Sequence, residues 1–324
     1  MKFANFAQAL AATILLMANA CAHAQADFPQ RPIRIIVAAP PGGGTDHMAR
    51  ILGNAISADT KWTIIVENKP GASGIIGTDA VARAKPDGYT LGMGLTATMA
   101  INPELFRTLS YSVLKDFSAV ATVAEQPVVL VVRADSPYHT VADLKAALKH
   151  KSMTLATAGV GTVGHLVGKV FGRQVGATFV EVPYKGSGPA LQDVAGGVVD
   201  VMFGTPPGVL PLIRSGHLRA LAVSSSKRLS LLPDVPTLAE AGCPDLDVSE
   251  WKVLVAPAGT PPAVVDLLNK EVRKVLTQPA LQKQMLVAGD LPLSGSVQYA
   301  QNFLKSQFSR WADIVRESGL SKSN

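Results

Sequence analysis

The chain has 324 residues, a length typical of about two domains. Hydrophobic residues make up 48% of it and charged residues 17%, which excludes an intrinsically disordered chain. The net charge of +6 is modest and the Lys and Arg residues are scattered. The sequence therefore lacks the clustered basic stripe of a nucleic-acid-binding protein, and we expect no nucleic-acid partner.

Residues 1–24 are expected to be a secretory signal peptide. Lys2 supplies a positive start, the apolar stretch 7–18 follows, and residues 22–24 (AHA) match an A-x-A cleavage site. The apolar stretch is too short to cross a bilayer. A lipid anchor on Cys21 is the alternative, although the residues before it lack the bulky aliphatic side chain that lipoprotein processing favours. We expect a periplasmic protein, cleaved after about Ala24.

The remaining sequence predicts strands that alternate with helices. Continuous apolar strands in such a pattern favour an α/β fold with parallel-rich sheets covered on both faces. The last helix carries Phe303, Phe308, Trp311 and Val315 near helical spacing, so this face should pack on the body. Strands are expected at 34–39, 63–67, 90–94, 128–133, 154–158, 178–183, 198–203, 218–224 and 252–256. Helices are expected up to 59 with Thr45 or Asp46 as cap, up to 84, and at 141–150, 163–174, 189–196, 209–215, 262–276, 279–288 and 297–318.

Two glycine-rich turns each end a predicted strand and open a helix. The first is PPGGGTD (40–46) and the second is TAGVGTVGH (157–165). The first N–H groups of a helix lack intrahelical partners and lie at the positive end of its dipole, and glycine lets a ligand approach them. A tight turn without a ligand is the alternative for each. The pair predicts two lobes that hold one small anion between them.

The second turn also matches a dinucleotide-binding fingerprint. Gly159, Gly161 and Gly164 have the G-x-G-x-x-G spacing, and Glu181 ends the next strand. A nicotinamide-dependent oxidoreductase is therefore the alternative function. The match lies in the middle of the chain, and an exported protein meets no retained pool of such cofactors. We expect no cofactor and no enzymatic activity.

Other signals for catalysis or metal binding are weak. The pairs Ser112–Lys115 and Tyr111–Lys115 match short catalytic patterns, but chance matches of this length are common. His47, His165 and His217 lack the spacing of metal ligands. We expect no catalytic residue and no metal, and an exported hydrolase remains only a weak alternative.

Further candidate ligand contacts follow other strands. Tyr184, Lys185 and Gly186 offer a hydroxyl, a positive charge and exposed N–H groups, which suit a carboxylate, with a solvated turn as the alternative. Hydroxyl groups in 96–98 and 204–205 follow two more strands. His165 lies in the first turn of a helix, where ligand contact and simple packing are both open.

Ten segments of the sequence carry a resemblance to a known family: RPIRIIVAAPPGGGTDHMAR (31–50), VENKPGASG (66–74), KPDGYTL (85–91), LSYSVLKDF (109–117), TAGVGTVGHL (157–166), VPYKGSGPALQD (182–193), GGVVDVMFG (196–204), SGHLRALAVSSSKR (215–228), LPDVPTLAEAG (232–242) and VAPAGTP (255–261). Over about 28–320 the chain resembles the Bug-type periplasmic solute-binding proteins of tripartite tricarboxylate transporter systems. The resemblance implies a two-lobed periplasmic binding protein (type II-like) with a ligand cleft between hinged lobes. With candidate crossovers at 126–133 and 218–226, we expect lobe 1 at 25–125 and 225–324, and lobe 2 at 126–224. The implied partners are a small organic anion, a mono- or dicarboxylate, and membrane permease subunits, and we expect a monomer.

The resemblance also implies which residues contact the ligand. This chain departs from the family pattern at Ala39, where an aromatic is frequent, and at Gly204, near which an acid or amide is frequent. It also has Lys252 and Val253 where an aromatic and a glycine are usual. We expect these departures to change the ligand rather than the fold. The implied ligand contacts are Gly43, Gly44, Thr45, Asp46, Thr96, Ala97, Thr98, Thr157, Gly159, Val160, Gly161, Thr162, His165, Tyr184, Lys185, Gly186, Gly204 and Thr205.

Overall fold

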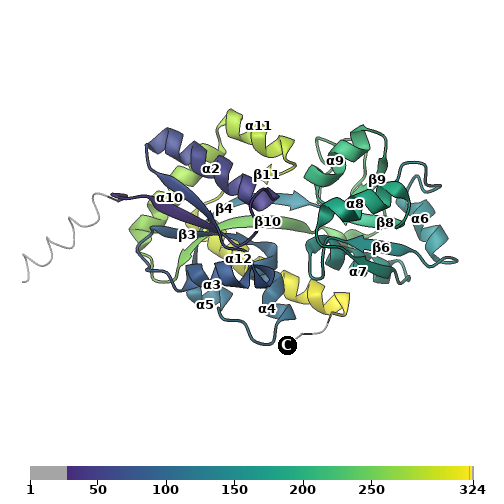
Figure 1. Cartoon of the computed structure of the whole chain (residues 1–324), viewed down its shortest axis with the longest axis horizontal. Helices are drawn as coiled ribbons and strands as arrows, with labels where there is room; N and C mark the ends of the chain where they lie inside the picture. Colours follow the sequence, from purple (N-terminus) through teal and green to yellow (C-terminus); the bar gives the residue numbers. More distant parts are fainter. Residues whose placement is uncertain (1–27, 321, 323–324) are drawn as a thin grey trace, which may run out of the picture.

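The computed structural model describes residues 28–320 and 322, which form two β-sheets in two lobes (Figure 1). The predicted signal peptide and its cleavage site lie outside the described residues. The first sheet contains β1 (Ile33–Val37), β2 (Ile64–Asn68), β3 (Thr90–Leu95), β4 (Phe117–Pro127), β10 (Ser249–Pro257) and β11 (Leu291–Pro292). The second contains β5 (Val129–Arg133), β6 (Thr154–Thr157), β7 (Val180–Pro183), β8 (Val201–Gly204) and β9 (Leu218–Val223).

Both sheets are mixed rather than wholly parallel. The strand orders are β11-β4-β10-β3-β1-β2 and β7-β6-β8-β5-β9. Parallel pairing joins β1 to β2 and β3, and β6 to β7 and β8. The strands β4, β10 and β5 pair antiparallel with their neighbours. Strand β4 was not predicted, because its small residues, as in SAVATVA, resemble neither an alternating nor a bulky apolar strand.

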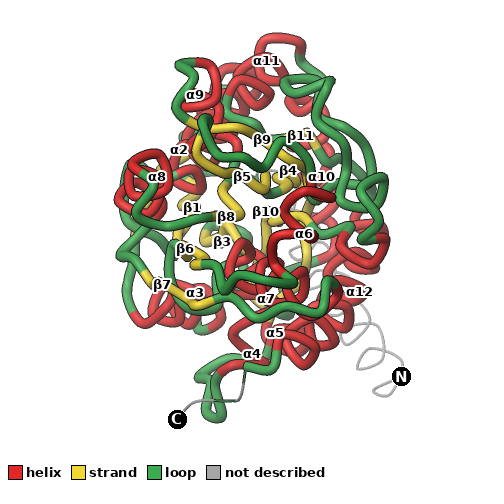
Figure 2. Tube along the Cα trace, turned by 90° about the vertical axis from the view of Figure 1, so that its right-hand side faces the viewer, coloured by secondary structure: helices red, strands yellow, loops and turns green. Residues whose placement is uncertain are grey.

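Helices surround the sheets, as Figure 2 shows in a view along the long axis from the second lobe. The predicted helices are present with ends shifted by a few residues, and 163–174, 262–276 and 297–318 agree at both ends. The helices are α2 (Gly44–Thr60), α3 (Ile75–Ala82), α4 (Asn102–Leu105), α5 (Val113–Asp116), α6 (Val141–Leu148), α7 (Val163–Gln174), α8 (Ser187–Gly196), α9 (Pro206–Arg214), α10 (Pro262–Leu276), α11 (Pro279–Val287) and α12 (Val297–Ser318). The shorter turns are η1 (Ala72–Gly74), η2 (Ala97–Ile101) and η3 (Pro244–Leu246).

The chain passes between the lobes twice, and one serine ties the two crossings together. In the first crossing β4 continues through Val128 into β5, and in the second a long segment joins β9 to β10. The backbone N–H of Val128 donates to Ser224 Oγ at 2.9 Å, and the Ser224 N–H donates to the Val128 carbonyl at 2.9 Å. The Ser224 hydroxyl also donates to the carbonyl of Val248. Ser224 is fully buried where the two crossings meet.

Helix α12 contacts both lobes. It packs against β4 in the first lobe and against α7 in the second. Trp311 and Val315 are buried, and Phe303 and Phe308 are partly buried against the same apolar cluster, which confirms the predicted packing face. This cluster therefore continues from one lobe into the other along one side of the molecule.

Candidate functional site

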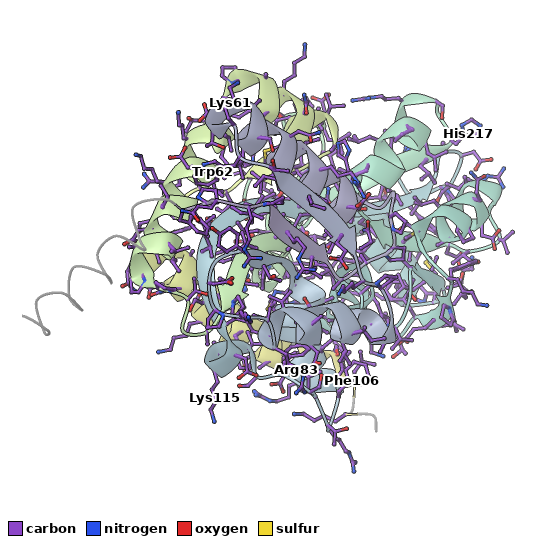
Figure 3. The ribbon with its side chains drawn as sticks, turned by 60° about the vertical axis from the view of Figure 1, so that its left-hand side comes forward. Lys61, Trp62, Arg83, Phe106, Lys115 and His217 are labelled. Carbon is purple, nitrogen blue, oxygen red and sulfur yellow. The ribbon has the colours of Figure 1, made fainter. Side chains whose placement is uncertain are left out.

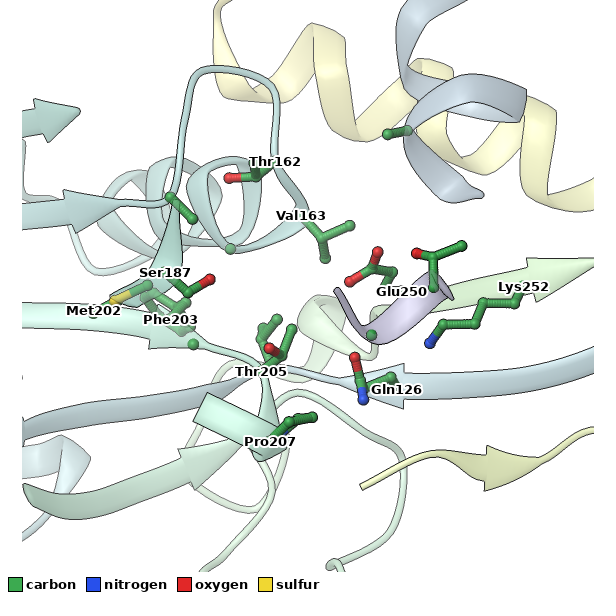
Figure 4. Close-up of a pocket in the computed structure, with 17 residues that line it drawn as sticks. Gln126, Thr162, Val163, Ser187, Met202, Phe203, Thr205, Pro207, Glu250 and Lys252 are labelled. Atoms are coloured by element: carbon green, nitrogen blue, oxygen red, sulfur yellow. The ribbon is translucent and has the colours of Figure 1, made fainter. Parts of the chain in front are cut away.

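A cavity of about 250 Å³ lies between the lobes, and both lobes contribute to its wall (Figure 4). Figure 4 shows Gln126, Glu250 and Lys252 on the first-lobe side, and Thr162, Ser187 and Thr205 on the other. The residues of the wall are Gly44, Thr45, Ala97, Gln126, Val128, Ala158, Thr162, Val163, Gly164, Ser187, Met202, Phe203, Gly204, Thr205, Pro207, Glu250 and Lys252.

Four helices begin at this cavity. Helix α2 starts with Gly44 and Thr45, α7 is capped by Thr162, α8 starts with Ser187 and α9 is capped by Thr205. The first N–H groups of a helix lack intrahelical acceptors and carry its positive partial charge, so their convergence favours an anion. Helix α9 differs from the other three, because it opens with two prolines that have no N–H group.

A second cavity of about 400 Å³ adjoins the first, since Ala97 and Thr162 line both. Its wall is mainly apolar on the first-lobe side and includes Leu105 and Phe106. The lobes approach closely here, because a Cβ atom added to Gly161 would lie 2.6 Å from Leu105 Cδ1. The wall consists of Ser73, Ala97, Asn102, Leu105, Phe106, Val160, Gly161, Thr162 and Leu320.

The structure divides the residues that the sequence singled out into two groups. The wall of the first or second cavity includes Gly44, Thr45, Ala97, Val160, Gly161, Thr162, Gly204 and Thr205. The other candidates lie outside both walls: Gly43, Asp46, Thr96, Thr98, Thr157, Gly159, His165, Tyr184, Lys185 and Gly186. Several residues outside the walls form hydrogen bonds that stabilise the turns on which the wall residues lie.

Asp46 stabilises the first glycine-rich turn from inside. Its Oδ2 accepts a hydrogen bond from the Gly42 N–H at 2.9 Å and another from Arg50 Nε at 3.0 Å. The bond from Arg50, with smaller help from Gly42, lowers the pKa of Asp46 to about 2 despite its burial. The predicted cap at Thr45 or Asp46 was wrong, because α2 begins at Gly44 and Gly43 occupies the N-cap.

His165 performs the same task in the second turn. Its Nδ1 accepts a hydrogen bond from the Gly161 N–H at 3.1 Å, so the ring proton is on Nε2, which donates to Glu181 Oε2 at 2.9 Å. The side chain is only 1% exposed. Burial raises the pKa of Glu181, but the hydrogen bonds from Lys169 and His165 outweigh it and the net shift is downward. His165 thus stabilises the turn. Because the Gly161 N–H group already donates to His165, it is not available to a ligand.

Threonine and tyrosine candidates are also engaged within the protein. The Thr96 hydroxyl accepts a hydrogen bond from the Trp251 N–H at 2.7 Å, which joins two neighbouring strands. The Thr98 hydroxyl bonds to the backbone of Leu95. The Tyr184 hydroxyl donates to Asp193 Oδ2 at 2.6 Å, and this bond raises the pKa of Tyr184 to about 12.

Three polar residues of the cavity wall were missed as candidates: Gln126, Glu250 and Lys252. Lys252 is 1% exposed, and its Nζ donates to Asp290 Oδ1 at 2.6 Å in a buried ion pair. A signal for two of them exists in the sequence, because polar Glu250 and Lys252 alternate with apolar Trp251 and Val253, but the predicted strand 252–256 left Glu250 out. Alternation places them on one face, but it does not reveal that the face borders a cavity.

One residue of the weak catalytic patterns has a structural role. Tyr111 is buried and its hydroxyl donates to the Thr98 carbonyl at 2.6 Å. Lys115 and His217 lie at the periphery, in the first and second lobe respectively (Figure 3). Among residues 28–320, no cluster of three or more His, Cys, Asp or Glu side chains could hold a metal ion. Within the same part of the chain, no helix is long and apolar enough to cross a membrane.

The two lobes and the cavity between them define a solute-binding protein of the periplasmic class. A sequence profile described as "Tripartite tricarboxylate transporter family receptor" matches residues 48–320, so the chain belongs to this family, which includes the Bug proteins. It is 39% identical over 297 residues to Protein BugT of Bordetella pertussis, covering 90% of each chain.

Two solved relatives carry named ligands. The chain is similar to Rpa4515 of R. palustris with adipate, at 32% identity and a TM-score of 0.83, covering 92% of this chain and 100% of the other. It is also similar to MatC from Rhodopseudomonas palustris with bound malate, at 33% identity and a TM-score of 0.77, covering 89% and 100%. The family consists of receptors and not of enzymes, and none of these relatives supports the oxidoreductase alternative. Glu181, the acidic residue of that fingerprint, is bonded to His165 and Lys169.

Proposed function

We propose that this protein captures a small mono- or dicarboxylate between its lobes in the periplasm. The observation that supports the proposal most is the convergence of α2 from the first lobe with α7 and α8 from the second on one cavity. Backbone N–H groups of Gly44, Thr45, Val163 and Gly164, with the Ser187 hydroxyl, are the proposed partners of the carboxylate. The adipate and malate of the two solved relatives are consistent with such a ligand.

The proposed capture involves bending between lobe 1 (25–125 and 225–324) and lobe 2 (126–224) near Ser224. Two crossings joined by hydrogen bonds at Ser224 would permit rotation of the lobes with little change inside either one. We further propose that the protein is exported after cleavage near Ala24, acts as a monomer, and presents its ligand to permease subunits of a tripartite tricarboxylate-type transporter.

Titration calorimetry with a panel of mono-, di- and tricarboxylates tests the proposal, with thermal shift as a second readout. We expect at least one mono- or dicarboxylate to bind, and a ligand at 100 times its Kd to stabilise the fold by about 2.7 kcal/mol. Ser187→Ala should weaken that binding. Ser215→Ala is the matched control and should leave ligand binding unchanged, because the Ser215 hydroxyl lies away from the cavity and bonds to His217. A panel in which nothing binds would contradict a carboxylate ligand.

A further inference from the structure

Three polar side chains share one face of the first sheet where it borders the cavity between the lobes. Glu250 and Lys252 are two residues apart on β10, so they point to the same side of the strand. Gln126 on β4 is the register partner of Glu250 and lies on that side too. All three line the cavity, opposite the helix N-termini of the second lobe (Figure 4).

Two of these three side chains already have partners in the protein. The Lys252 ammonium is neutralised by the Asp290 carboxylate at 2.6 Å, and both side chains are buried. The Gln126 Nε2 donates to the Ala288 carbonyl at 3.2 Å. Lys252 and Asp290 together therefore add no net charge to the cavity wall, and neither side chain is free to neutralise a third ion fully.

Glu250 is the charged residue of the described wall that has no ion-pair partner. No hydrogen bond or ion pair joins it to another side chain in the described part of the protein. Burial raises the pKa of Glu250, and Lys252 offsets this effect only in part. In Figure 4 the carboxylate extends toward the second lobe, into the space that a ligand would occupy. The first-lobe wall thus presents a carboxyl group whose ionised form is disfavoured by burial until a positively charged or N–H-bearing group lies against it.

A ligand that is only an anion fits this wall poorly. A carboxylate at the helix N-termini would share a cavity of about 250 Å³ with Glu250, and its negative charge would further disfavour the ionised form of Glu250, which burial already disfavours. A positively charged or N–H-bearing group on the same ligand would lie between the two carboxylates. This group would donate a hydrogen bond to Glu250 and stabilise its ionised form beside the carboxylate of the ligand.

We propose that the ligand of this receptor is a carboxylate that also carries an ammonium or similar N–H donor group, and that Glu250 accepts a hydrogen bond from that group. This inference rests on the proposed carboxylate binding and narrows its ligand to amino-substituted carboxylates. Glu250 then acts as a specificity-determining residue that separates such compounds from plain acids of the same carbon skeleton.

The test is a calorimetric comparison of skeleton-matched pairs: aspartate with succinate, glutamate with glutarate, and leucine with 4-methylpentanoate. In the wild-type protein we expect the amino-substituted member of at least one pair to bind roughly 10- to 100-fold more tightly, as a charge-assisted hydrogen bond warrants. Glu250→Gln keeps the side-chain shape and removes the charge. We expect it to abolish this preference and to leave binding of the plain acid unchanged or improved.

Glu125→Gln is the matched control, because Glu125 is the neighbouring residue of Gln126 and faces a different pocket near the crossings. It should keep the wild-type preference, and circular dichroism should confirm that both variants fold. Tighter binding of the plain acid by the wild type, or an unchanged preference in Glu250→Gln, would overturn the inference but leave carboxylate binding intact. Absence of binding to every compound by the wild type would instead overturn both proposals.

Discussion

Asp46 and His165 were predicted to contact the ligand, but their side chains bond to other residues of the protein and lie outside the cavity walls. Both belong to glycine-rich turns that border the cavity, and both are buried. The Asp46 carboxylate accepts from Gly42 and Arg50, and the His165 ring joins Gly161 to Glu181. These side chains hold the turns in place, so their effect on ligand binding is exerted through the backbone.

Asp46→Asn should destabilise the protein in a pH-dependent way. In the folded state the pKa of Asp46 is lowered from 3.8 to about 2. The ionised carboxylate therefore stabilises the fold fully at pH values above 3.8, the pKa in the unfolded chain, and this stabilisation is lost as the pH falls toward about 2. Because Arg50 is half-exposed, we expect a cost of only about 1 kcal/mol near pH 7. Urea unfolding of wild type and variant across this pH range measures it.

Asp234→Asn, at an exposed carboxylate in the segment between β9 and β10, serves as the matched control and should change stability little. A difference between Asp46→Asn and wild type that stayed constant from neutral to strongly acidic pH would show that the Asp46 charge has no part in holding the turn.

At the scale of elements, the alternation of strands and helices in the sequence was a good guide to the fold. Long amphipathic helices such as 163–174 and 297–318 were predicted with both ends correct, because their apolar spacing and caps are local. Strand β4 was missed, since its small side chains are selected by burial between neighbours that are distant in sequence. The cavity wall formed by β4 and β10 was missed for the same reason.

The close packing of α7 on β8 gives a matched pair of glycine substitutions. Gly164 and Gly188 are each the second residue of a helix at the cavity, in α7 and α8 respectively. A Cβ atom on Gly164 would lie 2.1 Å from the Phe203 carbonyl oxygen, whereas one on Gly188 would meet nothing within 4 Å. Gly164→Ala should therefore destabilise by about 1–3 kcal/mol and weaken ligand binding by displacing the helix.

Gly188→Ala should leave stability unchanged or raise it by about 0.5–1 kcal/mol, because alanine loses less backbone entropy in a helix. Chemical denaturation and calorimetric titration of the two variants side by side measure both effects. Equal stability of the two variants would mean that α7 is not held against β8 at Gly164.

At the scale of the whole molecule, the lobes are joined by more than two crossings. One apolar cluster includes Val81 of the first lobe, Trp311 of α12 and Phe171 of the second lobe. Helix α12 packs against both β4 and α7. The bending about Ser224 that we propose would therefore keep one side of the molecule in contact.

Because this cluster spans both lobes, we expect the described part of the protein to unfold as one unit. Scanning calorimetry should give a single transition with equal calorimetric and van't Hoff enthalpies. Saturating ligand should raise its midpoint as one peak. Two separate transitions, one of them insensitive to ligand, would indicate that the lobes are energetically independent despite the shared cluster.

Our central proposal is that both lobes bind one carboxylate ligand in the cavity between them. A crystal structure of the complex with the tightest-binding acid tests this claim most directly. We expect the ligand carboxylate to lie within hydrogen-bonding distance of 163–164 in α7 or of Ser187 in α8. The same ligand should also contact Gly44 or Thr45 of the first lobe. A ligand held by one lobe alone, or bound outside this cavity, would contradict it.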